Sequence, residues 1–364
     1  MKKRVVIGMS GGVDSSVAAW LLKEEGYDVI GITMQIWPER DIFEDEKEGG
    51  CCGLTAADDA RRVANKLGIP HYVLNFRDIF QQKVIDYFID EYQHCRTPNP
   101  CIACNRYVKW EALLDRSLEI GADYIATGHY AKVRQLDNGR YAVCKSETDT
   151  KDQTYALYNL TQEQLSRTLF PVGEYNKDQI RKFASDIGLI VANKPDSQEI
   201  CFIPDNDYAG FIEKNQSEEL TNAQKGNFVT KDGQILGPHK GITHYTIGQR
   251  KGLGLSLKQP GFVMDINPET KEVIIGNGED VWKNEVFFSN PNPMGVCEFT
   301  DGMHVLTKVR YSHKGQMATI HKDGELYRCV FDEPVRAATP GQAIVFYDGD
   351  VVLGGGTIER DPKN

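Results

Sequence analysis

The sequence predicts an α/β protein: a doubly wound parallel sheet comes first, a small β-rich central domain follows, and a C-terminal β-barrel comes last. Strand-like and helix-like segments alternate over the first two hundred residues, which is typical of a parallel sheet covered by helices. After about residue 205, short strands separated by hairpin turns replace this alternation. The Pro-rich stretch at 290–293 is typical of a linker between two β units. We therefore expect three domains, at residues 1–205, 206–282 and 283–364.

The elements of the first domain follow from apolar periodicity and from capping residues. Strands are expected at residues 5–7, 29–34, 71–76 and 124–127, and helices at 17–22, 55–67, 84–92 and 105–119. Thr55 is the expected N-cap of its helix and Gly68 the expected stop. The acidic, glycine-containing residues 37–53 are expected to form a mobile loop. Because ligands of such sheets bind at the carboxyl ends of the strands, Gly8 and Gly128 are expected to line one cleft.

Turn signals predict the two β domains. Hairpin turns are expected at residues 232–233, 267–270, 322–324 and 348–350. The last two of these divide a C-terminal segment of about 80 residues into short strands, which favours a small barrel.

Composition narrows the class of protein. The chain has 364 residues, of which 40% are hydrophobic and 26% charged, an ordinary globular balance. No apolar run approaches the roughly 20 residues that span a bilayer, and the basic start lacks the apolar core of a secretory signal. We therefore expect a cytoplasmic protein with no membrane partner. Nine cysteines favour reduced thiols over a disulfide framework. The net charge of −10 argues against nucleic acid as a partner unless basic residues gather on one face.

Residues 8–15, the glycine loop, read Gly-Met-Ser-Gly-Gly-Val-Asp-Ser between a β-branched strand and a helix. Gly11 and Gly12 have no Cβ, so backbone N–H groups can close around phosphate oxygens at the positive end of the helix. The loop has no lysine, which separates it from the common nucleotide loop that ends in Gly-Lys-Ser/Thr. The sequence therefore predicts an anion-binding loop of a different kind.

Two segments, 96–105 and 196–204, carry thiols with possible chemistry. Cys104 is expected at the start of a helix, where the dipole and unpaired N–H groups stabilise a thiolate. The Cys101–Cys104 spacing alone leaves a redox pair, half a metal site and coincidence open. Three further thiols lie in strand-like runs and are expected to be small core residues: Cys144, Cys297 and Cys329. Cys51 and Cys52 fit a structural role and an auxiliary sulfur-handling role equally well.

The glycine loop matches the Ser-Gly-Gly-x-Asp-Ser signature and so resembles the PP-loop ATP pyrophosphatases, which split ATP into AMP and pyrophosphate. Further motifs follow in one order: Thr-Pro-Asn-Pro-x-x-x-Cys-Asn at 97–105, Ala-Thr-Gly-His-Tyr at 126–130, Lys-Asp-Gln at 151–153, Ile-Cys-Phe-Ile at 200–203 and Thr-Ile-Gly-Gln-Arg-Lys-Gly-Leu-Gly at 246–254. This ordered set resembles the bacterial tRNA-specific 2-thiouridylases over essentially the whole chain. The first domain is accordingly expected to be an N-type PP-loop domain.

The resemblance implies specific site residues. Cys104 is the implied catalytic nucleophile and Cys201 the implied carrier of a persulfide. The implied ATP-binding residues are Gly8, Met9, Ser10, Gly11, Gly12, Val13, Asp14, Ser15, Met34 and Gly128. The implied tRNA-binding residues are Asn99, Pro100 and Cys101 at the target base, His129 near it, and Lys151, Asp152, Gln153, Arg310, Tyr311 and Gln342.

The resemblance also implies the reaction. ATP, with Mg²⁺, adenylates the 2-oxygen of the wobble uridine in tRNA for glutamate, glutamine and lysine, and the persulfide supplies sulfur. A cysteine desulfurase or a sulfur-carrier protein is the implied donor. The Cys201 loop is expected to close over bound tRNA and meet Cys104.

The chain departs from part of the family at Cys101, where some members carry an aspartate that acts as a general base. A thiol does not replace an ionised carboxylate. Cys101, Cys104 and Cys201 are therefore also alternative ligands for three irons of a 4Fe–4S cluster. Cys95 is a second departure, because glycine is common at that position.

Two other functions remain open from the residues alone. One is a PP-loop amidotransferase or ligase that acts on a small carboxylic acid and leaves the thiols idle. The other is a non-catalytic RNA-binding protein that uses ATP as a conformational ligand. Basic residues that would have to gather on one face for tRNA binding are Arg96, Arg106, Lys109, Lys132, Arg134, Lys145, Lys151, Lys308, Arg310, Lys314 and Arg336.

Overall fold

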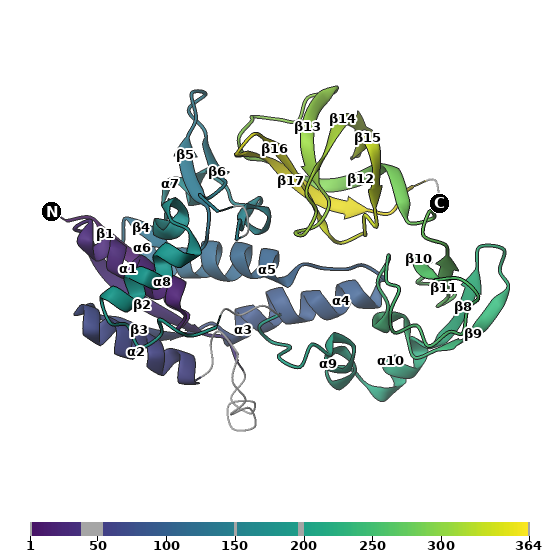
Figure 1. Ribbon diagram of the computed structural model, residues 1–364, viewed down its shortest axis with the longest axis horizontal. Helices are drawn as coiled ribbons and strands as arrows, with labels where there is room; N and C mark the ends of the chain where they lie inside the picture. The colour runs from purple at the N-terminus through teal and green to yellow at the C-terminus, as the bar shows by residue number, and fades with distance from the viewer. Residues whose placement is uncertain (1, 38–53, 149–150, 196–199, 363–364) are drawn as a thin grey trace.

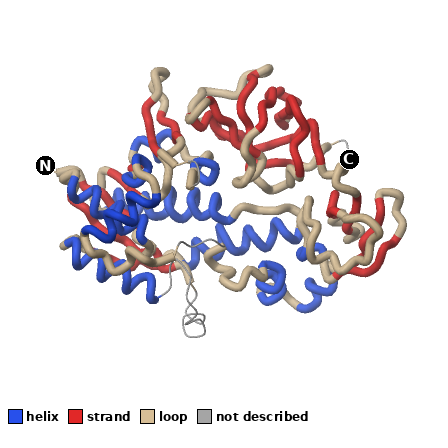
Figure 2. The backbone as a smooth tube through the Cα atoms, viewed as in Figure 1, coloured by secondary structure: helices blue, strands red, loops and turns tan. Residues whose placement is uncertain are grey.

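The computed structural model describes residues 2–37, 54–148, 151–195 and 200–362. Figures 1 and 2 show an α/β unit at the N-terminal end, a barrel above the centre and a small β unit at the far end of the long axis. The predicted mobile loop at 37–53 lies almost entirely outside the described residues, as do Cys51 and Cys52. No helix among the described residues is long and apolar enough to cross a membrane.

The first domain contains the predicted doubly wound parallel sheet, with strand order β3-β2-β1-β4-β7. Its strands are β1 (Arg4–Gly8), β2 (Asp28–Gln35), β3 (His71–Asn75), β4 (Tyr124–Ala126) and β7 (Thr168–Leu169). Successive residues of β1 serve opposite faces: Val5 and Ile7 pack in one core cluster and Val6 in another. The apolar run at 5–7 is therefore continuous because helices cover both faces.

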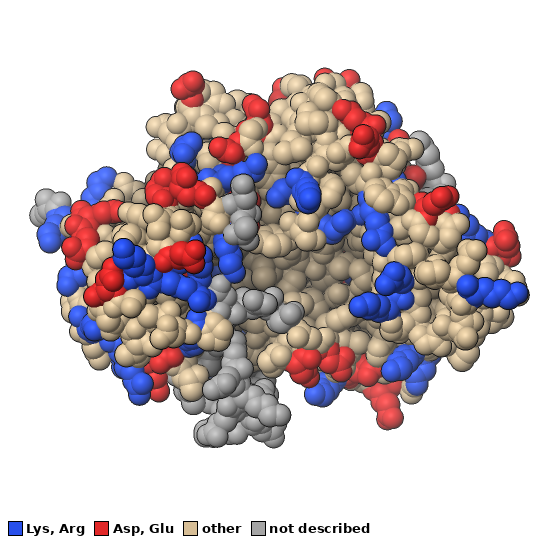
Figure 3. Space-filling model, in the orientation of Figure 1, with Lys and Arg blue, Asp and Glu red and all other residues tan. Residues whose placement is uncertain are grey.

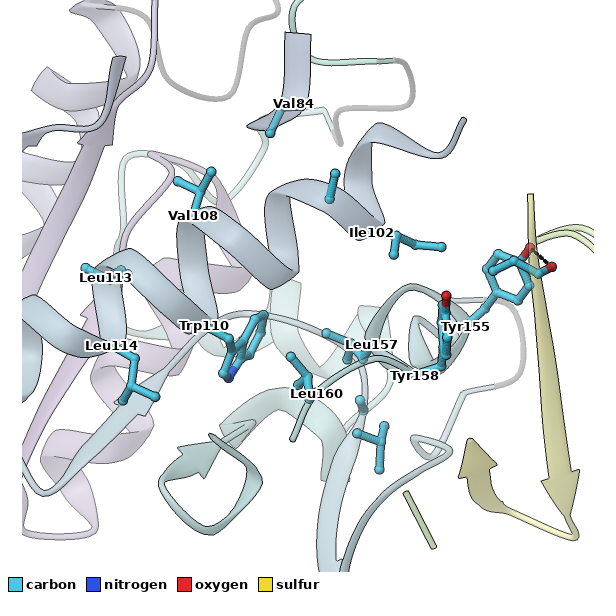
Figure 4. Close-up of a cluster of buried hydrophobic side chains, with 14 of the residues drawn as sticks. Val84, Ile102, Val108, Trp110, Leu113, Leu114, Tyr155, Leu157, Tyr158 and Leu160 are labelled. Atoms are coloured by element: carbon cyan, nitrogen blue, oxygen red, sulfur yellow. Dashed lines mark hydrogen bonds between the residues drawn. The ribbon is translucent and has the colours of Figure 1, made fainter. Parts of the chain in front are cut away.

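Helices on one face are α1 (Val13–Glu24), α2 (Leu54–Leu67) and α8 (Lys177–Asp186). Two long helices cover the other face, each with a π-helical middle: α3 (Arg77–Phe80), η1 (Gln81–Asp86) and α4 (Tyr87–Gln93), then α5 (Pro100–Ala103), η2 (Cys104–Leu113) and α6 (Leu114–Glu119). We call residues 100–119 the thiol helix. Figure 4 shows Trp110 of this helix facing Leu157 and Leu160 in the core.

Several helix starts differ from the sequence prediction. The thiol helix begins at Pro100 rather than at 105, because the Asn99 side chain caps it and proline suits the first turn. The helix expected at 84–92 begins at Arg77. Thr55 lies inside α2, which begins at Leu54, so its predicted capping role is wrong. Gly68, with φ +64°, ends α2 as predicted.

The short elements after β4 link the domains. The hairpin β5 (Lys132–Gln135) and β6 (Tyr141–Cys144) leaves the parallel sheet, and Cys144 pairs with Val351 of the barrel. The remaining elements of this region are η3 (Thr154–Leu157), α7 (Gln162–Ser166) and η4 (Pro171–Glu174). The first two hundred residues therefore do not form a simple strand–helix alternation.

The central β unit is a four-stranded sheet with order β10-β11-β8-β9. Helices α9 (Tyr208–Lys214) and α10 (Glu218–Ala223) lead into strands β8 (Gly226–Thr230), β9 (Ile235–His239), β10 (Phe262–Ile266) and β11 (Val273–Gly276), with the one-turn helix η5 (Ile242–His244) between them. Cys95 of the first domain packs in this core with φ +57°. A left-handed backbone favours glycine, so the cysteine occupies a position whose geometry suits the smaller residue.

Six strands close the predicted C-terminal barrel: β12 (Trp282–Pro293), β13 (Met303–Lys308), β14 (Gln316–Asp323), β15 (Leu326–Arg336), β16 (Ala343–Asp348) and β17 (Val351–Glu359). All four predicted hairpin turns connect consecutive strands. The predicted linker at 290–293 is wrong, because Asn292 and Pro293 pair with β17 inside β12. A register shift after Ser289 explains why prolines are tolerated there.

Candidate functional site

The glycine loop is held at the carboxyl end of β1 by the neighbouring strand. The Met9 N–H donates to the Ile32 carbonyl (2.8 Å), and the Thr33 hydroxyl donates to the Met9 carbonyl (2.9 Å). Gly11 has φ +68°, and a Cβ there would lie 2.3 Å from the Ala56 carbonyl oxygen, so only glycine fits. Gly12 precedes α1 with no side-chain cap among the described residues, which leaves this helix end suited to an anion.

Serines and Gly128 complete the loop. The Ser10 N–H donates to Ser15 Oγ (3.2 Å), and Ser16 Oγ donates to the Gly12 carbonyl (2.7 Å). A Cβ on Gly128 would lie 2.6 Å from the Ser15 nitrogen. The strand ends that carry Gly8 and Gly128 thus meet, as the sequence predicts. Met34 lies near the same end of the adjacent β2, half-buried, and Val13 is buried at the start of α1.

Two lysines that sequence reasoning did not single out lie at this loop. Lys177 Nζ donates to both carboxylate oxygens of Asp14 (2.7 and 2.8 Å), and Tyr130 Oη donates to the first of them (2.7 Å). Lys194 Nζ donates to the Gly11 carbonyl (3.1 Å) and pairs with Asp59 (2.9 Å). Asp14 Oδ1 thus accepts two hydrogen bonds and Asp14 Oδ2 accepts one. The two lysines place ammonium groups beside a loop that has no lysine of its own, each paired with a carboxylate.

The segment before the thiol helix is fixed by its own capping and by the barrel. Asn99 Oδ1 accepts the N–H groups of Cys101 (3.1 Å) and Ile102 (3.3 Å), and Pro100 occupies the first turn. Gln342 Nε2 donates to the Thr97 (2.9 Å) and Pro98 (3.3 Å) carbonyls. The predicted tRNA residues Asn99 and Gln342 therefore shape this loop, whatever else they contact.

The predicted position of Cys104 at a helix start is wrong. Cys104 lies one turn inside the thiol helix, and its backbone N–H bonds to the Pro100 and Cys101 carbonyls. The backbone N–H of Cys104 is therefore not one of the unpaired groups at the helix start. Cys101, in the first turn, occupies the position that favours negative charge, and its side chain is exposed.

A polar chain links the thiol helix to the glycine loop. Lys109 Nζ donates to Asn105 Oδ1 (2.8 Å) and lies 3.4 Å from His129 Nε2. His129 Nδ1 lies 2.6 Å from Thr127 Oγ1, and the ring packs against Trp110 and Phe170. Burial, and then the charge of Lys109, hold the pKa of His129 well below its usual value. Neutral His129, which follows Gly128 in the sequence, thus accepts a hydrogen bond from Lys109 through Nε2.

Predicted tRNA residues from two domains lie together. Tyr155 and Tyr311 contact edge to face with centroids 6.2 Å apart, and Tyr311 is 49% exposed. Burial raises the pKa of Tyr311, and Asp152 and Cys101 raise it further, while the charge of Lys151 lowers it. Asp152 accepts from Thr154 Oγ1 (2.8 Å), and burial raises its pKa. Lys151 is half-buried beside it.

The remaining predicted tRNA residues are engaged within the protein. Gln153 bonds twice to the backbone of Tyr130, through its own N–H (3.0 Å) and through Oε1 (2.8 Å). Arg310 donates to the Arg336 carbonyl (2.6 Å), and burial lowers the Arg310 pKa. Among the other basic candidates, Arg96 pairs with Glu91 and Glu359, and buried Lys132 pairs with Glu147 and Glu174. Arg96 and Lys132 therefore form ion pairs within the protein, which gives them a structural role.

Cys104 and Cys201 are both half-buried against the same core cluster. Phe202 anchors the Cys201 segment by packing on Phe80, Phe88 and Phe211, while residues 196–199 just before it lie outside the described part of the chain. Within the described ranges, which include Cys101, Cys104 and Cys201, no three His, Cys, Asp or Glu side chains are grouped to hold a metal. The conditional cluster ligands therefore do not fit a 4Fe–4S site in this conformation.

The remaining thiols are partly as predicted. Cys144 and Cys329 are buried in β6 and β15, and burial raises the pKa of both. Cys297 is exposed, so its predicted core position is wrong.

Relatives match the chain over its whole length. Residues 3–205 match the family model described as tRNA methyl transferase HUP domain, 214–277 the tRNA methyl transferase PRC-barrel domain, and 283–358 the aminomethyltransferase beta-barrel domain. The tRNA-specific 2-thiouridylase MnmA of Lachnoclostridium phytofermentans is 63% identical over 358 residues, covering 98% of this chain and 99% of that protein. The protein of the same name from Clostridioides difficile is 56% identical over 362 residues, covering 99% of each chain.

Proposed function

The chain belongs to the tRNA-specific 2-thiouridylase family, and we propose that it replaces the 2-oxygen of the wobble uridine of tRNA by sulfur in an ATP-dependent reaction. The substrates we propose are tRNA for glutamate, glutamine and lysine. The proposed sulfur source is a cysteine desulfurase or a carrier protein in the cytoplasm.

One observation carries this proposal: a single helix joins the thiol segment to the glycine loop. Cys104 begins the π-helical part of the thiol helix, and Lys109 on that helix reaches His129 (3.4 Å). The residue before His129, Gly128, lies against Ser15 of the glycine loop. Leu113 of the same helix lies near Gly8, 3.8 Å from the position of a Cβ there. A PP-loop ligase that acts on a small carboxylic acid would not need a cysteine-bearing helix packed against its glycine loop.

The first chemical step uses the glycine loop. The 2-oxygen of uridine attacks the α-phosphorus of ATP, pyrophosphate leaves, and the N3 proton is lost. The glycine loop and the N-terminus of α1 would hold the phosphates, and Lys177 and Lys194 would add positive charge. Adenylation converts the oxygen into part of a good leaving group, AMP.

The second step uses the two thiols. The terminal sulfur of a Cys201 persulfide attacks carbon 2 and AMP leaves. The Cys104 thiolate then attacks Cys201 Sγ, which breaks the sulfur–sulfur bond to the base and leaves 2-thiouridine with a Cys104–Cys201 disulfide. Alternatively, Cys104 attacks the persulfide first and releases hydrosulfide, which attacks carbon 2. Both routes consume one persulfide and need a reductant for the disulfide.

The Cys201 loop has to approach Cys104 in either route. Both residues are half-buried against the same core cluster, and we propose that the Cys201 loop moves toward Cys104 when tRNA binds. Thiol trapping in solution tests this step. Two sulfurs that are already in bonding range without tRNA would contradict the movement.

The product identifies the reaction. We expect purified protein, ATP, a cysteine desulfurase with its cysteine substrate, a reductant and unmodified tRNA to give 2-thiouridine at the wobble position, with release of AMP and pyrophosphate. Two of the matched family models are described as tRNA methyl transferase domains. Mass spectrometry of the nucleoside separates the two chemistries, and a methylated uridine or an ATP-independent product would refute the proposal.

A further inference from the structure

A second feature lies where the central β unit meets the barrel. A groove of about 710 Å³ is lined there by Arg250, Lys251 and Arg336 together with Phe262 and Trp282. None of the described residues that line it is acidic. Two of its cations come from the Thr-Ile-Gly-Gln-Arg-Lys-Gly motif of the central unit, for which the catalytic mechanism gives no role.

The groove is a built site, because the surrounding backbone is fixed from both sides. The Gly248 N–H donates to the Val263 carbonyl (2.7 Å), and the Val263 N–H donates to the Gln249 carbonyl (3.0 Å). Gly248 has φ +89°, and a Cβ there would lie 2.5 Å from Ala337 Cβ. The motif is therefore pinned against the barrel loop that follows Arg336.

Its charges and rings are arranged for a polyanion with π faces. The Arg336 guanidinium lies 5.0 Å from the centroid of Phe262, across the boundary between barrel and central unit. Arg250 and Lys251 are exposed, and Trp282 is 49% exposed. Cations beside an open aromatic ring are the combination that binds a sugar–phosphate backbone and stacks a base.

The groove continues the predicted tRNA surface. Arg310 donates to the Arg336 carbonyl (2.6 Å), and Tyr311 follows Arg310 beside the Cys101 segment. Lys and Arg side chains border the upper and right-hand sides of the central hollow in Figure 3, in a chain whose net charge is −10. In Figure 1, β10 nevertheless lies well away from α5 along the longest axis. One long ligand fits this layout better than a separate small molecule.

We propose that this basic groove binds the phosphate backbone of the same tRNA, at a segment outside the anticodon hairpin whose uridine reaches Cys104. The proposal rests on the proposed function and adds a binding site to it. The groove would hold the tRNA in register while the hairpin enters the catalytic site.

Charge reversal tests the groove. The variant Arg250→Glu/Lys251→Glu changes two exposed cations, and Arg181→Glu/Lys182→Glu on α8 is its control, with the same residue types and the same change in charge. We expect the groove variant to weaken the affinity for full-length tRNA about tenfold or more and to reduce the slope of log Kd against log salt by roughly 1.4 to 1.8. Affinity for a hairpin RNA that carries only the anticodon arm should stay unchanged.

Each other outcome has one meaning. An unchanged tRNA affinity and salt slope would overturn the groove proposal, provided that the wild-type protein binds and thiolates tRNA. Equal loss on both RNAs would overturn the assignment to a separate segment. An equal loss of tRNA affinity in the α8 control would show that net charge alone causes the effect, and this would also overturn the groove proposal. Failure of the wild type to thiolate tRNA would instead refute the proposed function.

Discussion

Lys177 Nζ lies 2.7 and 2.8 Å from the two carboxylate oxygens of Asp14, across 163 residues of sequence. The pair joins the start of α8 to the start of α1, and Tyr130 adds a third contact. A loop that has no lysine of its own thus has an ammonium group beside it. The position of this pair at the anion site leads to the first prediction.

Removal of the Lys177 charge should weaken ATP binding. Lys177→Ala leaves Asp14 with an uncompensated charge near the expected phosphates, so we predict a rise of tenfold or more in the KM for ATP. Lys177→Arg should recover part of this loss, because the charge remains. The affinity for tRNA should not change. Steady-state kinetics with Lys182→Ala as a control on the same helix checks the effect, and an unchanged KM for ATP would contradict it.

Gly11→Ala should distort the glycine loop and lower the stability of the protein. The φ of +68° alone costs about 1–2 kcal/mol for alanine, and contact with the Ala56 carbonyl adds to that cost. Gly139→Ala is the matched control, since Gly139 has φ +81° but no atom within 4 Å of a Cβ. Urea unfolding should give a larger loss of stability for Gly11→Ala. Equal losses in the two variants would contradict the close packing at Gly11.

The thiols should differ in role. Cys104→Ser and Cys201→Ser should lower thiolation at least 100-fold while tRNA-dependent release of pyrophosphate persists, because adenylation does not use sulfur. Cys101→Ala should retain most thiolation, and exposed Cys297→Ser should behave as wild type. Iron content and visible absorption of anaerobically purified protein complete the test. Bound iron that is lost equally from the Cys101, Cys104 and Cys201 variants would favour the cluster-dependent route.

Gln342 should act through the loop that it holds. Its amide bonds to the Thr97 and Pro98 carbonyls, so Gln342→Ala should loosen the segment that leads to Asn99 and the thiol helix. We predict a five- to tenfold lower kcat for thiolation with little change in tRNA affinity. Single-turnover rates and filter binding measure the two quantities separately. A large loss of tRNA affinity at unchanged kcat would assign Gln342 to direct RNA contact instead.

Stability should fall as the pH falls below about 6.5, the ordinary histidine pKa. Burial and Lys109 lower the pKa of His129 in the folded protein, so the unfolded chain binds the proton more readily in this range. Burial and nearby Arg310 lower the pKa of His313 to about 4, which acts in the same direction. Urea unfolding at pH 7.5 and 5.5 should show a smaller loss for His129→Gln than for wild type. The exposed His94→Asn is the control, and identical losses in all three proteins would contradict the role of His129.

Local signals predicted much of the fold. The β-branched run at 5–7, Gly68 after α2 and the four hairpin turns depend on neighbours in sequence, and each is confirmed. The prolines at 291 and 293 misled because they carry the same local signal in a linker and in an irregular strand. The thiol helix began earlier than predicted because Asn99 and Pro100 form its capping turn.

Long-range contacts account for what the sequence did not predict. Pairing of Cys144 with Val351 brings the β5–β6 hairpin to the barrel, and no local pattern indicates this partner. The same holds for Lys177 and Lys194, which reach the glycine loop from more than 150 residues away. The strand–loop–helix conformation at residues 8–15 was predicted correctly because the loop is a continuous motif, and its ATP-binding residues stay a prediction. Cations added by tertiary packing leave no such motif.

The most direct test of the account is whether labelled sulfur moves from Cys201 to tRNA only when ATP is present. The protein is charged once with isotopically labelled persulfide on Cys201, freed of excess sulfide and mixed with tRNA, with or without ATP. The account predicts labelled 2-thiouridine at the wobble position, in an amount that matches the persulfide lost, only when ATP is present. Labelled product without ATP, or unlabelled product with ATP while the persulfide remains on Cys201, would contradict it.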